Sequence, residues 1–256
     1  MNKHYCCTDL HSMGKLWDQI KNYCDKTDTI YFLGDAADRG DEGLRVMREL
    51  LQDKRVIFIK GNHEDILTKV AEGYYDSSVW KINGGNITLR DYKHLPEISK
   101  HWYLRKISNM PDYVTYTNIR GQNIILSHAG VNPWDMYEAS NKREESPWQW
   151  NRTHFYRDWS SDSKWDNTYV IHGHTPVQYL ISALNDVNRF KDSSQQYIWN
   201  EEILNYADGH KFDLDLGSFQ IGKIALFDLD ELKVEKYFYD LEVYKKYKNE
   251  WRKNFK

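Results

Sequence analysis

The sequence predicts an α/β fold with a partly parallel sheet and a second sheet, on three observations. Short apolar runs rich in Val, Ile, Tyr and Phe recur along the chain, as is typical of buried strands. The segments between the first three runs carry apolar residues at helical spacing. Residues 218–239 read as two strands joined by a turn at Asp228–Glu231, which indicates an antiparallel hairpin.

In chain order, each predicted strand leads into a polar cluster. HYCC precedes TDLHS, TIYFL precedes GDAADRG, RVIFIK precedes GNHED, NIIL precedes SHAG, and TYVI precedes HGHTP. The first two connecting segments, GKLWDQIKNYC and EGLRVMRELLQ, are predicted helices. Because strand–helix alternation gathers loops at the carboxyl ends of parallel strands, we expect these polar clusters to converge.

We predict a single domain for residues 1–256, since the chain has no internal repeat, low-complexity tract or linker rich in Pro and Gly. Two cap-like insertions are expected. One lies near residues 132–168, where clustered tryptophans pack together or stack on a substrate base, and the other lies near residues 182–212, which are polar and weakly periodic. For residues 240–256 we predict a C-terminal helix that packs on the rest of the protein through aromatic side chains at helical spacing. The alternative is a basic arm that binds nucleic acid or a partner.

Composition narrows the class of protein. Hydrophobic residues make up 40% and charged residues 29% of the chain, as in globular proteins. The net charge of −3 gives no general attraction for nucleic acid or acidic membranes, so we expect neither as a partner. The three cysteines lack CxxC spacing and suit a reducing compartment, with Cys6 and Cys7 buried in a strand. We therefore expect a cytoplasmic protein without a membrane span.

The polar clusters contain the side chains that bind divalent metal ions. Carboxylate oxygen, amide oxygen and imidazole are suitable ligands for Mn, Fe or Zn. Asp9 and His11 are two residues apart, which places both on one side of an extended segment, where they can chelate one ion. Asp35 has two oxygens and can bridge that ion to another. Asn62, His128 and His174 would complete the second ion.

The ordered motifs DLH, GDAADRG, GNHE, SHAG and GHT resemble the metallophosphoesterase superfamily. They are most similar to the serine/threonine phosphoprotein phosphatases of the bacteriophage lambda phosphatase type. VWKINGGNITLRDY, WNR at Trp150–Arg152, and DLG at Asp215–Gly217 extend the resemblance over nearly the whole chain, although the family usually has DTG at the last position. The resemblance implies a β-sandwich of two mixed sheets flanked by helices.

The resemblance also implies a role for each motif residue. Asp9 and His11 match ligands of one metal ion, Asp35 the bridging carboxylate, and Asn62, His128 and His174 ligands of the other ion. The implied cofactor is a pair of divalent ions, most suitably Mn, with Fe, Zn or Ni as alternatives. His63 matches the histidine that protonates the leaving oxygen, and Asp38 the carboxylate that orients it. Arg39 and Arg152 match arginines that hold phosphate oxygens.

We therefore expect hydrolysis of phosphomonoesters, of a phosphorylated protein or a small molecule, by a water that two metal ions share. The first alternative is hydrolysis of a dinucleoside polyphosphate of the diadenosine tetraphosphate type. The second is an inactive phosphate-binding module, which is disfavoured because every ligand position is retained. Lys60 stands where the family usually has arginine, which would loosen phosphate binding. His172 reads as a strand residue or as a hydrogen-bond donor behind the site.

Overall fold

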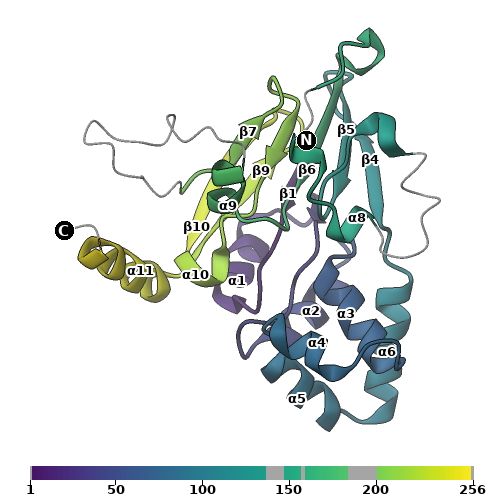
Figure 1. Cartoon of the computed structure of the whole chain (residues 1–256), viewed down its shortest axis with the longest axis vertical. Helices are drawn as coiled ribbons and strands as arrows, with labels where there is room; N and C mark the ends of the chain where they lie inside the picture. Colours follow the sequence, from purple (N-terminus) through teal and green to yellow (C-terminus); the bar gives the residue numbers. More distant parts are fainter. Residues whose placement is uncertain (1, 137–146, 157–158, 184–200, 255–256) are drawn as a thin grey trace.

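A computed structural model describes residues 2–136, 147–156, 159–183 and 201–254 (Figure 1). The first sheet has the strand order β10-β9-β1-β2-β3, and the second has the order β4-β5-β6-β8-β7. Both sheets mix parallel and antiparallel pairs and are flanked by helices, as the sequence and its resemblance predict.

The first sheet is built on the three N-terminal strands. β1 pairs in parallel with β2, and β2 with β3, while β9 runs antiparallel to β1 and forms the predicted hairpin with β10. The start of the predicted first strand of this hairpin is wrong, because residues 218–221 form a short helix that ends at Gly222, with a φ of 65°, and the strand begins only after it. The strands are β1 (His4–Cys7), β2 (Thr29–Phe32), β3 (Val56–Phe58), β9 (Lys223–Asp228) and β10 (Lys233–Tyr239).

In the second sheet, β5, β6 and β8 run parallel to one another, with β4 and β7 antiparallel at the two edges. The strands are β4 (Tyr113–Thr117), β5 (Asn123–Ser127), β6 (Thr168–His172), β7 (Leu204–Tyr206) and β8 (Lys211–Asp213). Residues 184–200 of the stretch expected to be an insertion lie outside the described residues, and the end of that stretch supplies β7 and most of β8. Residues 137–146 and 157–158 of the other expected insertion also lie outside them.

Helices fill the connections and cover the first sheet. The two predicted helices are present as α1 (Gly14–Tyr23) and α2 (Gly43–Gln52), and α11 (Leu241–Asn254) lies near the C-terminus. The others are α3 (Asn62–Ala71), α4 (Ser77–Ile82), α5 (Asn86–His94), α6 (Glu97–Ser108), α8 (Pro147–Trp150), α9 (Val177–Ala183) and α10 (Ser218–Ile221), with 3₁₀ turns at Pro133–Asp135, His154–Tyr156 and Ser163–Trp165. No helix among the described residues is long and apolar enough to cross a bilayer.

The two largest apolar clusters among the described residues hold these layers together. One lies between the first sheet and its helices and includes Leu16, Trp17 and Met47. The other joins side chains of both sheets, with Cys6 from β1 and Phe227 from β9 meeting β5, β6 and β8. Cys6 and Cys7 are fully buried, as predicted. The second core fixes the two sheets face to face, and with them the loops that leave both sheets.

Phe227 offers a test of that inter-sheet core. Its ring is fully buried, and its centroid lies 5.1 Å from that of Phe212 on the other sheet. We expect Phe227→Ala to lower the free energy of unfolding by about 3–5 kcal/mol, because it leaves a cavity between the sheets. Urea denaturation measures this loss. Ile119→Ala, at a side chain that is 74% exposed, is the control and should change stability by less than about 0.5 kcal/mol. Equal effects would contradict the assigned core.

Candidate active site

The loops that follow β1, β2, β3, β5 and β6 meet at one edge of the two sheets. Asp9 N donates to the Gly34 carbonyl at 3.1 Å, which joins the loops after β1 and β2. His174 N donates to Asp9 Oδ2 at 3.0 Å, which joins the two sheets. The structure thereby brings together all six predicted metal ligands in one buried cluster: Asp9, His11, Asp35, Asn62, His128 and His174.

Four of these six residues have a strained backbone. Asp9, His11, Asp35 and His174 have φ angles of 53°, 43°, 61° and 71°, in the left-handed region that residues other than glycine rarely adopt. Such a conformation costs about 1–3 kcal/mol for each residue and persists only where the surrounding contacts impose it. The strained backbone therefore lowers the stability of the fold but directs these side chains into the cluster.

Two glycines of the motifs lie so close to ligand carboxylates that no larger residue fits. A Cβ atom on Gly173 would lie 2.1 Å from Asp9 Oδ2, and one on Gly61 would lie 2.3 Å from Asp35 Oδ1. Both distances are far below van der Waals contact, so only glycine lets these backbones pass the carboxylates. The glycine before Asn62 and the glycine before His174 are thus part of the site.

The first ligand set surrounds His11. Its Nδ1 lies 3.0 Å from the Ala37 carbonyl, which can only accept, so Nδ1 carries the proton. The neutral ring then directs the Nε2 lone pair toward Asp9 Oδ1 at 3.7 Å and Asp35 Oδ2 at 3.6 Å. A lone pair that faces two carboxylates is stabilised by a cation between them.

The second ligand set is tighter. His128 Nε2 lies 2.8 Å and His174 Nδ1 2.9 Å from Asn62 Oδ1, and the two imidazole nitrogens are 3.2 Å apart. His128 Nδ1 donates to the Leu33 carbonyl at 2.6 Å, so its Nε2 also presents a lone pair. Two ligands at about 2.1 Å from one ion are about 3.0–3.4 Å apart. The two imidazole nitrogens lie within this range and the amide oxygen is 0.1–0.2 Å closer to each, so a small outward shift of Asn62 would let the set hold one divalent ion.

Asp35 lies between the two sets and has one oxygen for each. Its Oδ2 faces His11, whereas its Oδ1 lies 3.4 Å from His128 Nε2 and accepts a hydrogen bond from His63 N at 3.0 Å. Burial alone would raise the pKa of Asp35, but the surrounding imidazoles, His128 and His63 first, lower it well below its usual range. This is the geometry of a bridging carboxylate.

The electrostatics of the cluster also call for added positive charge. Burial, followed by the charge of Asp35, raises the pKa of Asp9 to about 8. Burial lowers the pKa of His11 and of His174 well below the ordinary value, so these rings are neutral. Among the described residues, Asp9 Oδ1 is one of the buried oxygens without a hydrogen-bond partner. A divalent ion beside Asp9 would complement this oxygen and let the carboxylate ionise.

His63 and Asp38 form a hydrogen-bonded pair beside this cluster. His63 Nδ1 donates to Asp38 Oδ2 at 2.6 Å, and its Nε2 lies 3.6 Å from Asp35 Oδ2 and 3.4 Å from Arg39 Nη2. Burial alone would lower the pKa of His63, but the carboxylates of Asp35 and Asp38 outweigh it and raise the pKa. His63 is also close enough to His11 and Asp35 to share an ion, so its role as proton donor stays a prediction.

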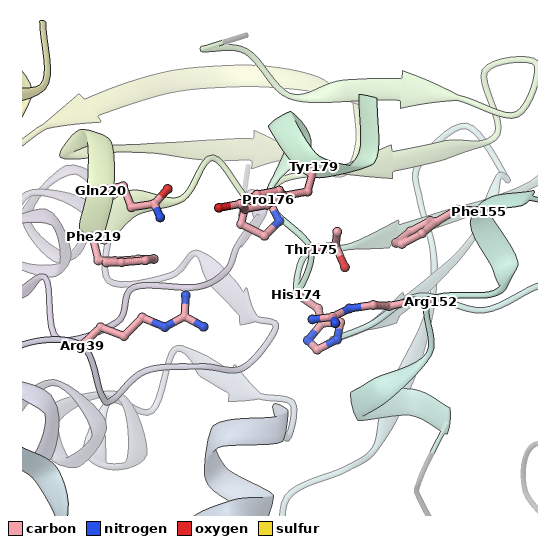
Figure 2. Close-up of a pocket in the computed structure, with 9 residues that line it drawn as sticks. All are labelled: Arg39, Arg152, Phe155, His174, Thr175, Pro176, Tyr179, Phe219 and Gln220. Carbon is pink, nitrogen blue, oxygen red and sulfur yellow. The ribbon is translucent and has the colours of Figure 1, made fainter. Parts of the chain in front are cut away.

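The predicted phosphate-binding arginines lie around a cavity of about 560 Å³ (Figure 2). Arg39 enters from one side beneath Phe219, with its guanidinium carbon 4.6 Å from the ring centroid, and Arg152 enters from the other side beside His174. Phe155 and Tyr179 add two further aromatic walls. The sequence did not indicate these three aromatic side chains as part of the site.

Three supporting residues were also missed. Glu64 accepts hydrogen bonds from the backbone N–H groups of Asp35, Ala36 and Gly61 at 2.9–3.0 Å. The Ser218 hydroxyl donates to the Asp9 carbonyl, and the Trp80 indole donates to Asp38. Glu64 stands in the GNHE motif, which was a signal for it. Ser218 follows DLG, and Trp80 stands in VWKINGGNITLRDY, a segment to which the resemblance extends but for which it implied no role.

Other polar residues from the sequence lie outside the ligand cluster. His172 Nε2 lies 2.7 Å from the Tyr206 hydroxyl, and burial lowers the pKa of His172 to about 3. It is thus a neutral strand residue, in line with the interpretation from the sequence. Lys60 Nζ lies 3.6 Å from Asp112 Oδ1, so it is engaged by a carboxylate rather than extended toward the cavity.

Comparisons with known proteins agree with this geometry. The family model described as calcineurin-like phosphoesterase matches residues 3–216. The bis(5'-nucleosyl)-tetraphosphatase PrpE (asymmetrical) of Oceanobacillus iheyensis is 27% identical over 194 residues, covering 68% of this chain and 74% of that protein. Serine/threonine-protein phosphatase 2 of Salmonella typhimurium is 24% identical over 214 residues, covering 81% and 83%. A solved structure of a candidate diadenosine tetraphosphatase, 14% identical, has a similar fold, with a TM-score of 0.58 and coverage of 93% of each chain.

His174 and His172 form a matched pair for testing the ligand assignment. They are two residues apart, but only His174 faces Asn62 and His128. We expect His174→Ala to lose about one divalent ion per chain, because one ion loses a ligand, whereas His172→Gln should keep the wild-type content. Elemental analysis after dialysis against Mn measures both. Unchanged metal content in His174→Ala would refute its assignment as a ligand.

Proposed function

We propose that this chain, which belongs to the calcineurin-like phosphoesterase family, hydrolyses phosphomonoesters with two divalent metal ions in the cluster centred on Asp35. The family match confirms the superfamily that the motifs predict. The observation that carries the proposal is the placement of the Asp38–His63 pair directly beside two ligand sets that share one carboxylate.

The metal ions, Mn being the best suited and Fe, Zn or Ni the alternatives, would supply a water of lowered pKa and neutralise charge on the phosphate. The chain's own residues do the rest. Arg39 and Arg152 reach into the cavity from opposite sides, where guanidinium groups can hold phosphate oxygens. Alignment and charge neutralisation are the main requirements of phosphoryl transfer.

The leaving oxygen needs a proton when it departs as an alkoxide. His63 directs Nε2 toward Asp35 and Arg39, while Asp38 holds Nδ1. A protonated Nε2 can therefore donate to the leaving oxygen of a phosphomonoester. A phosphoanhydride has a better leaving group and needs this proton less. The pair thus favours ester substrates such as a phosphorylated side chain, in line with the phosphoprotein-phosphatase resemblance.

A second candidate is hydrolysis of a dinucleoside polyphosphate. The aromatic walls Phe155, Tyr179 and Phe219 favour it, since a nucleobase stacked on such a ring gains about 1–3 kcal/mol. The cavity of about 560 Å³ has the size of a small-molecule site. The similarity to a bis(5'-nucleosyl)-tetraphosphatase points the same way.

A substrate comparison with Mn separates the two candidates. We expect a phosphoserine peptide to be hydrolysed with a higher kcat/KM than diadenosine tetraphosphate. Tyr179→Ala, which removes a cavity wall, should then change kcat/KM for the peptide by less than about threefold. The control is Tyr74→Ala, at an exposed tyrosine outside the cavity.

The opposite substrate preference would favour the second candidate. Preference for diadenosine tetraphosphate, with a KM that rises about tenfold or more in Tyr179→Ala but not in Tyr74→Ala, would replace the first candidate by the second. Failure of the metal-loaded chain to hydrolyse either substrate would contradict both.

A further inference from the structure

Trp80, on α4, connects the helical part of the chain to the proposed proton donor. Its indole Nε1 lies 3.0 Å from Asp38 Oδ1 and 2.8 Å from Asp38 Oδ2. The same Oδ2 accepts the hydrogen bond from His63 Nδ1 at 2.6 Å. All three side chains are buried, with exposed fractions of 1–2%. Trp80, Asp38 and His63 thus form one continuous chain of hydrogen bonds that ends at His63 Nε2.

The indole of Trp80 fixes which groups donate and which accept in this series of hydrogen bonds. The indole N–H can only donate, so it holds Asp38 as an acceptor and limits rotation of the carboxylate. An acceptor at Asp38 keeps the proton on His63 Nδ1 and leaves Nε2 to face the reacting oxygen. Hydrogen bonds to a charged group inside a protein are stronger than neutral ones, so loss of this donor should be measurable.

Residues that follow Trp80 also bind the backbone of the loop that contains Asp38 and Arg39. The Gly84 carbonyl accepts from Arg39 N at 3.0 Å, and the Thr88 hydroxyl oxygen accepts from Asp38 N at 3.2 Å. Asp38 and Arg39 have φ angles of 70° and 64°, so the loop that they form needs such support. The segment from Trp80 to Thr88 therefore binds Asp38 at two places, its side chain and its backbone.

Close packing fixes Trp80 itself. A Cβ atom on Gly85 would lie 1.9 Å from Trp80 Cδ1, so a glycine is required where the chain passes the edge of the indole. Tyr92 packs with its ring centroid 6.0 Å from that of Trp80. Within the described residues, the lining of the catalytic cavity does not include Trp80. Its hydrogen bonds to Asp38 are therefore the direct link between Trp80 and the proposed proton donor.

We infer that the segment Trp80–Thr88 positions the proton donor, with Trp80 holding the Asp38 carboxylate and Thr88 its backbone so that His63 presents Nε2 to the leaving oxygen. This inference rests on the proposed function, because it requires His63 to act as a proton donor. Trp80 and Thr88 are positioning residues, and neither lines the cavity that Arg39 and Arg152 enter.

The test uses the dependence of rate on the leaving group. Trp80→Phe removes the N–H donor but keeps an aromatic ring in the core. With Mn, we expect kcat for phenyl phosphate, a poor leaving group, to fall by about tenfold or more. The kcat for p-nitrophenyl phosphate, a good leaving group, should fall by less than about threefold, and KM should change little for either ester.

Trp17→Phe is the matched control. Trp17 is fully buried, and its indole nitrogen has no hydrogen-bond partner among the described residues. The substitution removes the same atoms from a core indole without breaking a hydrogen bond, so it should cause no change that depends on the leaving group. Thr88→Val is a second variant that spares the tryptophan. It should show the same leaving-group dependence as Trp80→Phe, which keeps the test decisive if Trp80→Phe does not fold.

Two further variants distinguish this inference from the proposed function. His63→Asn should itself show a large, leaving-group-dependent loss of kcat; without it, the proton-donor role fails and the inference fails with it. If His63→Asn shows that loss, equal losses for both esters in Trp80→Phe and Thr88→Val would overturn the inference alone. In an Asp38→Asn background, Trp80→Phe should add no further loss, and an additive loss would also overturn it.

Discussion

The buried carboxylate of Asp35 is the constraint on which the rest of the site depends. It faces His11 with one oxygen and His128 with the other, and no other described side chain reaches both ligand sets in this way. Its backbone is left-handed and is held by Glu64, while Gly61 leaves room for its oxygen. A carboxylate buried at this cost between two ligand sets is stabilised by cations on both of its sides.

The architecture follows from the need to place that carboxylate. Parallel strands in both sheets deliver their loops to one edge, and the inter-sheet core keeps the two groups of loops in contact. His174 N, in the loop after β6 of the second sheet, donates to Asp9 Oδ2 in the loop after β1 of the first. The left-handed φ angles of Asp9, Asp35 and His174 and the close approach of Gly61 and Gly173 to the carboxylates occur at this junction, as expected where stability is exchanged for function.

Most of the strands and all six candidate metal ligands could be predicted from the sequence. The ligands follow apolar runs, and Asp, His and Asn at strand ends are unusual enough to be noticed together. The supporting residues could not be read in the same way. Trp80 lies in the motif segment VWKINGGNITLRDY, but the sequence does not show that its N–H points at Asp38. Phe219 and Tyr179 enter the cavity only because short helices, α10 and α9, follow the DLG and GHTP turns. Their role depends on tertiary packing rather than on local pattern.

The most direct test of the central claim is electron paramagnetic resonance of the chain loaded with Mn. Two ions that share the Asp35 carboxylate lie about 3.5–4 Å apart, which is close enough for their spins to couple. We expect two bound Mn ions per chain and the broad multiline signal of a coupled pair. A simple six-line signal from isolated Mn, at either one or two ions per chain, would contradict a shared carboxylate and the account built on it.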